Sequence, residues 1–336
     1  MLPPRLVTER LLLREFRPED VGPGVASAQD PEVQRFLGGP KDAYEAFTGL
    51  ATHAGHWSLR GYGSWIVQRR EDDEPLGRVG LWHPERWPGV EVGWRLYRSA
   101  WGGGYATEAA RAAIGWAWTA RGFDELISLI YPENVASQRV AQRLGHVNRG
   151  PIEIFLGTVD RWVLARPPGD EAYNFRPATH DDAQRIADFM AEAFARYRDF
   201  SPPGWAPRLP PLQAEHEALD ASDARCVLCE PGGVLAGIVS WRPAATSRLR
   251  SPDPGLVHFG RLFVHPGWQG TGLAERLHAM AIDDVRARGF RELVLFTPAG
   301  QGRARRFYER LGWRQVRVID PDDLFGMPTV EYTYTI

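Results

Sequence analysis

Hydrophobic and polar positions along the chain predict the same series of elements twice. Each half contains a strand of alternating or apolar residues, a loop, a helix, a second strand and a short helix that ends at a glycine. In the first half these elements cover residues 90–96, 104–118, 125–131 and 135–144. In the second half they cover residues 257–264, 272–288, 291–296 and 303–311. Repetition of this order at a similar offset predicts two copies of one mixed α/β fold.

A short stretch rich in Pro and Gly, residues 165–171, separates the two halves. The chain then restarts with a predicted strand that ends at Pro177, and Thr179 or Asp181 can cap a helix over residues 183–197. We therefore expect an N-terminal domain over residues 1–166 and a C-terminal domain over residues 172–336. Two loops of the second half, residues 200–211 and 246–255, fit neither helix nor strand, and either could border a binding site or connect elements in solvent.

Composition excludes some classes of function. The net charge of −2 over 336 residues gives no electrostatic reason to expect nucleic acid or an anionic membrane as a partner. No apolar stretch approaches the roughly 18 residues that a membrane-spanning helix needs. The first residues lack the apolar core of a secretory signal, so the cytoplasm is the expected location. The sequence carries no signal for an oligomeric state.

Two cysteines, Cys226 and Cys229, have the spacing of a redox pair or of half a zinc site. They lie in an apolar stretch that reads as a strand, where residues three apart point to opposite faces. We therefore expect a structural role for both residues and no bound metal.

Glycine-rich turns precede the longer helix of each repeated unit, at residues 102–106 and 270–274. Unpaired N–H groups and the helix dipole make such a turn an anion site, and glycine lets the main chain approach a pyrophosphate closely. Neither turn has the Lys–Ser/Thr of a P-loop or the dinucleotide pattern G-x-G-x-x-G. Taken alone, each could equally be a simple tight turn.

The surrounding motifs resemble those of the GNAT superfamily of N-acetyltransferases. Residues 101–109 (WGGGYATEA) are similar to the superfamily's acetyl-CoA-binding segment, and residues 134–145 (NVASQRVAQRLG) to its next motif. With residues 10–14 (RLLLR), the first half resembles the branch that acetylates the N-termini of ribosomal proteins. In the second half, residues 262–274 (LFVHPGWQGTGLA) and 303–313 (RARRFYERLGW) are similar to the general pattern. The resemblance implies two α/β domains, each with a central mixed, mostly antiparallel sheet flanked by helices.

The resemblance also implies which residues bind acetyl-CoA. The turn N–H groups would hold the pyrophosphate, and the pantetheine arm would lie along the end of the preceding strand. Acyl transfer would be direct attack by the amine in a ternary complex. In the first half the implied residues are Leu96, Gly102, Gly103, Gly104, Tyr105, Ala106, Asn134 and Ser137. In the second half they are Leu262, Val264, Gln269, Gly270, Thr271, Gly272, Leu273, Ala274 and Gln301.

The two halves differ in their candidates for acid–base chemistry. Tyr308 matches the family tyrosine that protonates the leaving thiolate, a task that suits its protonated form at neutral pH. The first half has Ala141 at that position and carries Asn134 and Ser137 instead.

Glu91 and His258 are the candidate bases that deprotonate the amine. Glu91 could equally be a solvated strand residue, and His258 a hydrogen-bonded core residue. Two residues depart from the usual pattern: Gln301 replaces an Asn, and Trp101 replaces a Gln or Arg.

The sequence therefore predicts an acetyl-CoA-dependent N-acetyltransferase that acts on a primary amine of a small molecule or peptide. The alternative is a protein that binds acyl-CoA or another ligand and in which one or both copies are catalytically silent. Because only the second half has the tyrosine, we expect catalysis there, although the branch that the first half resembles works without it.

Overall fold

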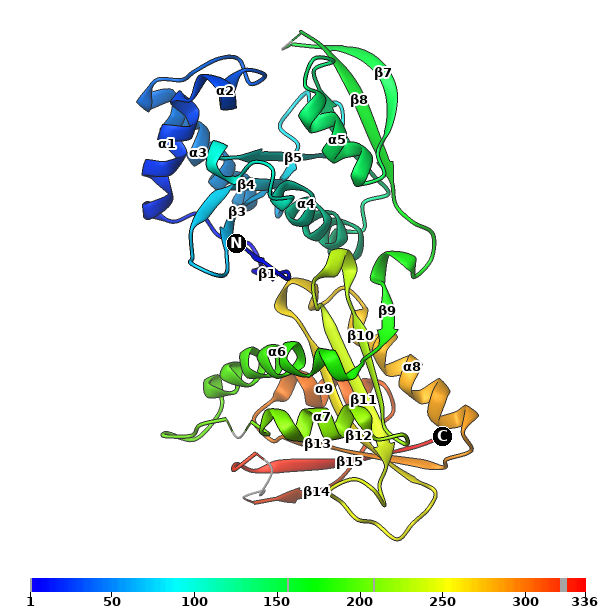
Figure 1. Ribbon diagram of the computed structural model, residues 1–336. Helices are drawn as coiled ribbons and strands as arrows, with labels where there is room; N and C mark the ends of the chain where they lie inside the picture. Colours follow the sequence, from blue (N-terminus) through cyan, green and yellow to red (C-terminus); the bar gives the residue numbers. More distant parts are fainter. Residues whose placement is uncertain (1, 156, 208, 321–324) are drawn as a thin grey trace. The chain divides into compact units, whose positions relative to one another are not determined.

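A computed structural model describes residues 2–155, 157–207, 209–320 and 325–336 (Figure 1). The chain divides into two compact units, each containing one sheet. The first comprises Met1–Asn174 with the short segments Glu230–Val234 and Pro266–Trp268. The second comprises Phe175–Cys229, Leu235–His265 and Gln269–Ile336. This division falls close to the predicted linker at residues 165–171 but is not a single cut in the sequence.

The described part of the first unit has an eight-stranded sheet in the order β1-β2-β3-β4-β5-β6-β8-β7. Its strands are β1 (Leu6–Val7), β2 (Leu11–Arg14), β3 (Ser64–Arg69), β4 (Pro75–Trp82), β5 (Glu91–Leu96), β6 (Glu125–Ile130), β7 (Val147–Ile154) and β8 (Gly157–Ala165). Its α-helices are α1 (Val21–Gln29), α2 (Pro31–Gln34), α3 (Ala43–Arg60), α4 (Tyr105–Trp116) and α5 (Val135–Arg143). Neighbouring strands are antiparallel except β5 and β6.

The described part of the second unit has a seven-stranded sheet in the order β14-β15-β13-β12-β11-β10-β9. Its strands are β9 (Phe175–Pro177), β10 (Arg225–Cys229), β11 (Gly237–Pro243), β12 (Leu256–Val264), β13 (Glu292–Pro298), β14 (Arg314–Ile319) and β15 (Thr329–Thr335). Its α-helices are α6 (Ala183–Ala195), α7 (Leu212–Asp220), α8 (Leu273–Ala287) and α9 (Gly302–Arg310). Here β12 and β13 form the parallel pair.

Local sequence explains where several helices begin and end. Thr179 and Asp182 form a reciprocal capping box before α6, as the acidic start of that segment predicts. Asp42 and Glu45 form another before α3, which ends at Gly61 in the left-handed region, with φ of 72°. The helix predicted over residues 183–197 ends two residues early, because a 3-10 turn follows Ala195.

Both copies of the predicted unit are present, as β5–α4–β6–α5 and β12–α8–β13–α9. The mixed α/β class and the mostly antiparallel sheets are confirmed. The helix predicted over residues 104–118 is shorter as an α-helix, because a π-helical turn replaces it from Ala117 to Arg121.

Along the described residues, every helix is too short or too polar to cross a bilayer. Cys226 and Cys229 lie on strand β10, as predicted, and both are free thiols. Burial raises the pKa of Cys226 to about 12, which leaves its thiol unreactive at neutral pH. The described residues contain no cluster of three or more His, Cys, Asp or Glu side chains that could hold a metal ion.

Candidate active site

The glycine-rich turn of the first unit leads directly into α4. Gly102 and Gly104 have φ of 80° and 78°, in the left-handed region that favours glycine. Within α4, Glu108 donates its N–H to the carbonyl of Gly104, so the N–H groups of the preceding turn have no intrahelical acceptor. Arg10 braces the turn, because it donates to the carbonyl of Gly103 and to the carboxylate of Glu108.

The turn before α8 in the second unit has the same geometry. Gly270 and Gly272 have φ of 82° and 83°, and a Cβ atom on either would meet no atom within 4 Å. Arg276 donates its N–H to the carbonyl of Gly272. Both turns therefore present an open main chain at a helix N-terminus, as the sequence predicts for an anion site.

One hydrogen bond ties each turn to the strand before it. The indole Nε1 of Trp101 donates to the carbonyl of Leu96 at 3.1 Å, and Nε2 of Gln269 donates to the carbonyl of Val264 at 3.3 Å. Leu96 and Val264 are the last residues of β5 and β12. Trp101, which departs from the usual pattern, thus makes the same contact as the expected glutamine.

The parallel pair of the first sheet separates almost at once. The strands β5 and β6 are paired in register only at Glu91 and Ile127. The side chain of Glu91 accepts hydrogen bonds from Nε1 of Trp87 at 2.8 Å and from the N–H of Leu129 at 3.4 Å. Burial raises the pKa of Glu91 to about 7, and these hydrogen bonds and the charge of Arg78 oppose the rise. Such a pKa suits a general base at neutral pH.

Two arginines share the face of the first sheet that carries Glu91. Arg78 on β4 lies opposite Arg95 on β5. On the same face of the sheet, the next pair is Gly80 with Gly93, and the pair after that is Trp82 with Glu91. Burial lowers the pKa of Arg95. Burial also lowers the pKa of Arg78, and the positive charge of Arg95 lowers it further. This face therefore combines a candidate base with positive charge.

Asn134 and Ser137 contact each other at the start of α5. The side-chain Oδ1 of Asn134 accepts from the N–H of Ser137 at 3.2 Å, which caps the helix. The hydroxyl of Ser137 accepts from Nε1 of Trp94 on β5 at 3.3 Å. Both residues thus connect the start of α5 with the strand that carries Glu91, and their part in binding or catalysis stays a prediction.

The second sheet also separates along its parallel pair. The register between β12 and β13 ends at His258 and Val294. Two residues further on, a β-bulge leaves Gly260 without a partner on β11, because Trp241 pairs with Phe259 and Ser240 with Arg261. A glycine inside a strand pattern is a sequence signal for such a bulge.

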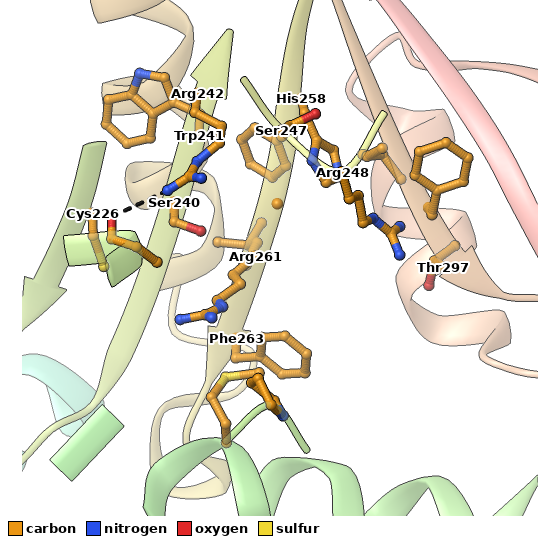
Figure 2. A pocket seen from close by; sticks show the side chains of 18 of the residues that line it. Cys226, Ser240, Trp241, Arg242, Ser247, Arg248, His258, Arg261, Phe263 and Thr297 are labelled. Carbon is orange, nitrogen blue, oxygen red and sulfur yellow. Dashed lines mark hydrogen bonds between the residues drawn. The ribbon is translucent and has the colours of Figure 1, made fainter. Parts of the chain in front are cut away.

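A cavity of about 470 Å³ opens where these strands diverge (Figure 2). Both strands contribute to its wall beyond their last paired residues, through residues 260–263 of β12 and 295–297 of β13. Both unassigned loops also line it, the first through Trp205 and the second through Arg248. These loops therefore border the cavity. Gln301, the residue directly before α9, is also part of the wall, and its side chain accepts a hydrogen bond from the hydroxyl of Thr297 at 2.9 Å.

Tyr308 reaches the cavity from α9 and is almost wholly buried among aromatic rings. Its ring lies 5.7 Å from that of Trp313 and 6.5 Å from that of Phe259, measured between centroids. Burial raises the pKa of Tyr308, so its hydroxyl stays protonated at neutral pH. A protonated hydroxyl is the form that a general acid needs.

His258 lines the same cavity but is a weaker base than its residue type suggests. Burial and then the charges of Arg248 and Arg242 lower its pKa to about 3. Its ring also packs edge-on against Phe296, at 5.9 Å between centroids. His258 is therefore neutral at physiological pH and holds a proton only weakly.

Several residues of the cavity were not found from the sequence. Arg242 and Arg261 lie on strands whose partners the pattern does not specify, and Glu215 lies on α7, which was not predicted. Glu215 is 1% exposed and accepts both hydrogen bonds of a two-point contact from Arg261, at 2.6 and 2.8 Å. A charged residue inside an otherwise amphipathic stretch gives no sign of such pairing until the fold is known.

Comparison with known proteins agrees with this geometry. Residues 10–147 match the model of the acetyltransferase (GNAT) domain, and residues 190–313 match the model of the acetyltransferase (GNAT) family. The chain belongs to the GNAT family, and it contains two such domains in tandem. It is an acyltransferase of the N-acetyltransferase kind.

Individual relatives match one half of the chain. YkkB of Bacillus subtilis (strain 168) is 34% identical over 149 residues, which are 42% of this chain and 84% of YkkB. The uncharacterised N-acetyltransferase YoaA of the same organism is 24% identical over 157 residues, 46% of this chain and 88% of YoaA. An acetyltransferase structure from Agrobacterium tumefaciens is 28% identical, covers 49% of this chain and 96% of its own, and has a TM-score of 0.46.

Proposed function

We propose that the chain is an acetyl-CoA-dependent N-acetyltransferase whose second unit transfers the acyl group to a primary amine of a small molecule or peptide. The observation that carries the proposal is the cavity at the split between β12 and β13. It is lined by both diverging strands and by Tyr308, so one space brings together a slot for a thioester, a proton donor and room for an acceptor.

Each part of this site has a role in the proposal. Acetyl-CoA supplies the reactive thioester when it is bound. The open turn of residues 270–274 holds the pyrophosphate with its N–H groups. The bulged segment of β12 beside Gly260 offers main-chain groups for the pantetheine arm and the thioester oxygen. Tyr308 donates its proton to the departing sulfur, and neutral His258 receives the proton of the amine, directly or through water.

The first unit supports a second candidate site. It has the same turn and the same bond from turn to strand, and Glu91 has a pKa of about 7, near the optimum for a base at neutral pH. It lacks a tyrosine at Ala141. We therefore place the main activity in the second unit and treat transfer by the first unit as the specific alternative.

Two measurements on the full chain test the proposal. Calorimetric titration with acetyl-CoA counts the binding sites, and release of free thiol in the presence of a panel of amines measures transfer. We expect binding together with amine-dependent thiol release. Binding without release from any amine would favour a ligand-binding protein with silent copies, and absence of binding would refute the proposal.

A further inference from the structure

The face of the first sheet that carries Glu91 holds two arginines directly opposite each other. Arg78 and Arg95 are partners in register on β4 and β5, so their Cβ atoms lie about 5 Å apart on one face. Neither forms an ion pair with a carboxylate of the described residues. Arginine keeps its charge in proteins even where burial lowers its pKa. Like charges in directly opposite positions destabilise a sheet, so this pair needs an explanation other than stability.

The described polar contacts of the pair are few, and they are made with a neutral group. Nη1 of Arg78 donates to Nδ1 of His53 on α3 at 3.3 Å. Burial, and then the charges of Arg78 and Arg95, lower the pKa of His53, so its ring is neutral at physiological pH. Nε of Arg78 donates to no described acceptor, and the side chain of Arg95 makes no hydrogen bond within the described part of the chain. The two guanidinium groups therefore keep most of their N–H donors for another acceptor.

Gly93 leaves a space between these arginines and the candidate base. It lies two residues from Glu91 and two from Arg95 on β5, so all three share one face. Outside its chain neighbours, a Cβ atom on Gly93 would meet one described atom within 4 Å, Oε1 of Glu91 at 3.9 Å. All three residues are half-buried, so this part of the strand is accessible from solvent. The carboxylate of Glu91 thus borders an open space that lies one two-residue step, about 7 Å, from Arg95.

We propose that the space above Gly93 is the acceptor site of the first unit, and that its acceptor is an amine carrying an acidic group, a carboxylate or a phosphate. Arg95 binds the acidic group through the planar donors of its guanidinium, and the amine lies toward Glu91. Arg78 adds positive charge from the neighbouring strand. The inference rests on the proposed function, because it takes the first unit as the second candidate site for transfer.

The charges of this face exclude the opposite kind of acceptor. Glu91 supplies at most one negative charge against the two positive charges of Arg78 and Arg95. A polyamine would add further positive charge to this face, whereas an acidic group supplies the charge that the arginines lack. The arrangement that destabilises the free sheet therefore favours the sheet with an acid bound.

Equilibrium binding of matched probes tests the inference without turnover. The probes are 4-aminobutyrate, its uncharged amide 4-aminobutanamide, and 3-aminopropylphosphonate, each titrated into the full chain by calorimetry. All three carry the same primary amine and differ in the acidic group. We expect the better of the two acids to bind at least about tenfold more tightly than the amide, because charge-assisted contacts to arginine are strong. The ratio of carboxylate to phosphonate affinity then identifies the acidic group.

Variants locate the contact on this face. Arg95→Gln should remove most of the preference for the acid and leave binding of the amide unchanged, and Arg78→Gln should act in the same direction. Arg161→Gln is the matched control, because Arg161 lies on β8 of the same sheet and its charge is paired with Glu125. The control should keep the full preference. Equal binding of acids and amide to the unchanged chain would overturn the inference, as would an acid preference that survives in both Arg95→Gln and Arg78→Gln.

Thermal unfolding separates binding from a structural role of the same residue. Removal of one of two opposed like charges should keep or raise the unfolding midpoint of the free Arg95→Gln chain. The preferred acid should raise the midpoint of the unchanged chain and not that of the variant. A midpoint that falls in Arg95→Gln while the acid preference persists would assign Arg95 to the framework and refute the proposal.

The proposed function is measured separately on the same samples. Titration with acetyl-CoA and thiol release report on it, and neither enters the comparison of acid with amide. An acid preference that depends on Arg95 in a chain without transferase activity would thus refute the proposed function and leave the binding site standing. If Arg78→Gln fails to fold, Arg95→Gln and the preference of the unchanged chain still decide the question.

Discussion

The indole of Trp101 donates its N–H to the carbonyl of Leu96, and this bond has a counterpart between Gln269 and Val264 in the other unit. Two chemically different side chains thus fasten the glycine-rich turn to the end of the strand before it. The turn is held by a side chain outside its glycines, so the glycines leave the proposed anion site open. The glycines are therefore the positions where a substitution should act most directly on nucleotide binding.

Gly104→Asp and Gly272→Asp should each abolish or weaken acetyl-CoA binding by at least about tenfold in their own unit only. The new carboxylate would fill the anion site and repel the pyrophosphate. Gly104→Ala and Gly272→Ala are the controls, because they share the backbone strain of a positive φ without the charge. Calorimetry with unchanged affinity and stoichiometry in both Asp variants would refute the assignment of these turns.

Tyr308→Phe should lower turnover by roughly 10- to 1,000-fold, the usual range for loss of one proton-transfer group, while acetyl-CoA affinity stays near normal. The change removes one hydroxyl and little packing volume from the aromatic cluster around α9. Ser137→Ala should then matter little. The reverse result, loss in Ser137→Ala and normal turnover in Tyr308→Phe, would move the chemistry to the first unit.

Any transfer by the first unit should rise with pH through about 7 and then level off. Glu91 must be ionised to act as a base, and burial raises its pKa to about 7. The rate is best measured in a Tyr308→Phe background, where the second unit is weakened. Glu91→Gln, which keeps the shape of the side chain, should remove this limb of the pH–rate profile. An identical profile in the two proteins would exclude Glu91 as the base.

His258 should remain neutral throughout the range from pH 5 to pH 8. Its pKa of about 3 in the folded protein lies below the ordinary value of 6.5, so the unfolded chain binds the proton first as the pH falls. The free energy of unfolding should therefore decrease below about pH 6.5, and His258→Gln should reduce this loss. Denaturant titrations at pH 5 and pH 8 measure the difference, and a His258 ring that titrates near 6.5 by NMR would contradict it.

Residues 1–166 and 172–336 should each fold when expressed alone, because each piece carries all strands of one sheet. Circular dichroism and cooperative thermal unfolding of the two pieces provide the test. A second piece that binds a hydrophobic dye and unfolds without cooperativity would show that it depends on the first. The segments that group with the first unit, Glu230–Val234 and Pro266–Trp268, are then the place to look for the cause.

The repeated pattern made the fold accessible from the sequence. Alternation in β5 and the 3.6-residue rhythm of α8 depend on local geometry alone, and so does the cap at Thr179. The two long loops could not be placed in the same way. Trp205 and Arg248 line one cavity although more than 40 positions separate them in the printed sequence. No local sequence pattern predicts that two such distant residues lie close together.

The candidate site was predicted by residue type more successfully than by environment. Tyr308 and His258 do line one cavity. The sequence around His258, however, does not show which two arginines lower the pKa of this histidine. Trp57 and Trp268 are buried core residues, whereas Trp205 lines the cavity, and the residue type alone does not distinguish these outcomes. Burial decides these outcomes, and burial follows from the tertiary structure.

In each sheet the parallel pair of strands stops pairing early. Each sheet therefore has two unpaired strand edges in its interior as well as its two outer edges. The hydroxyl of Ser128 on β6 donates to the carbonyl of Val92 on β5, and so occupies part of such an edge. Main-chain groups on an open edge are a template for any extended polypeptide, including one from another copy of the chain. If acetyl-CoA binds as proposed, its thioester arm occupies the same groups and shields them from strand-mediated aggregation.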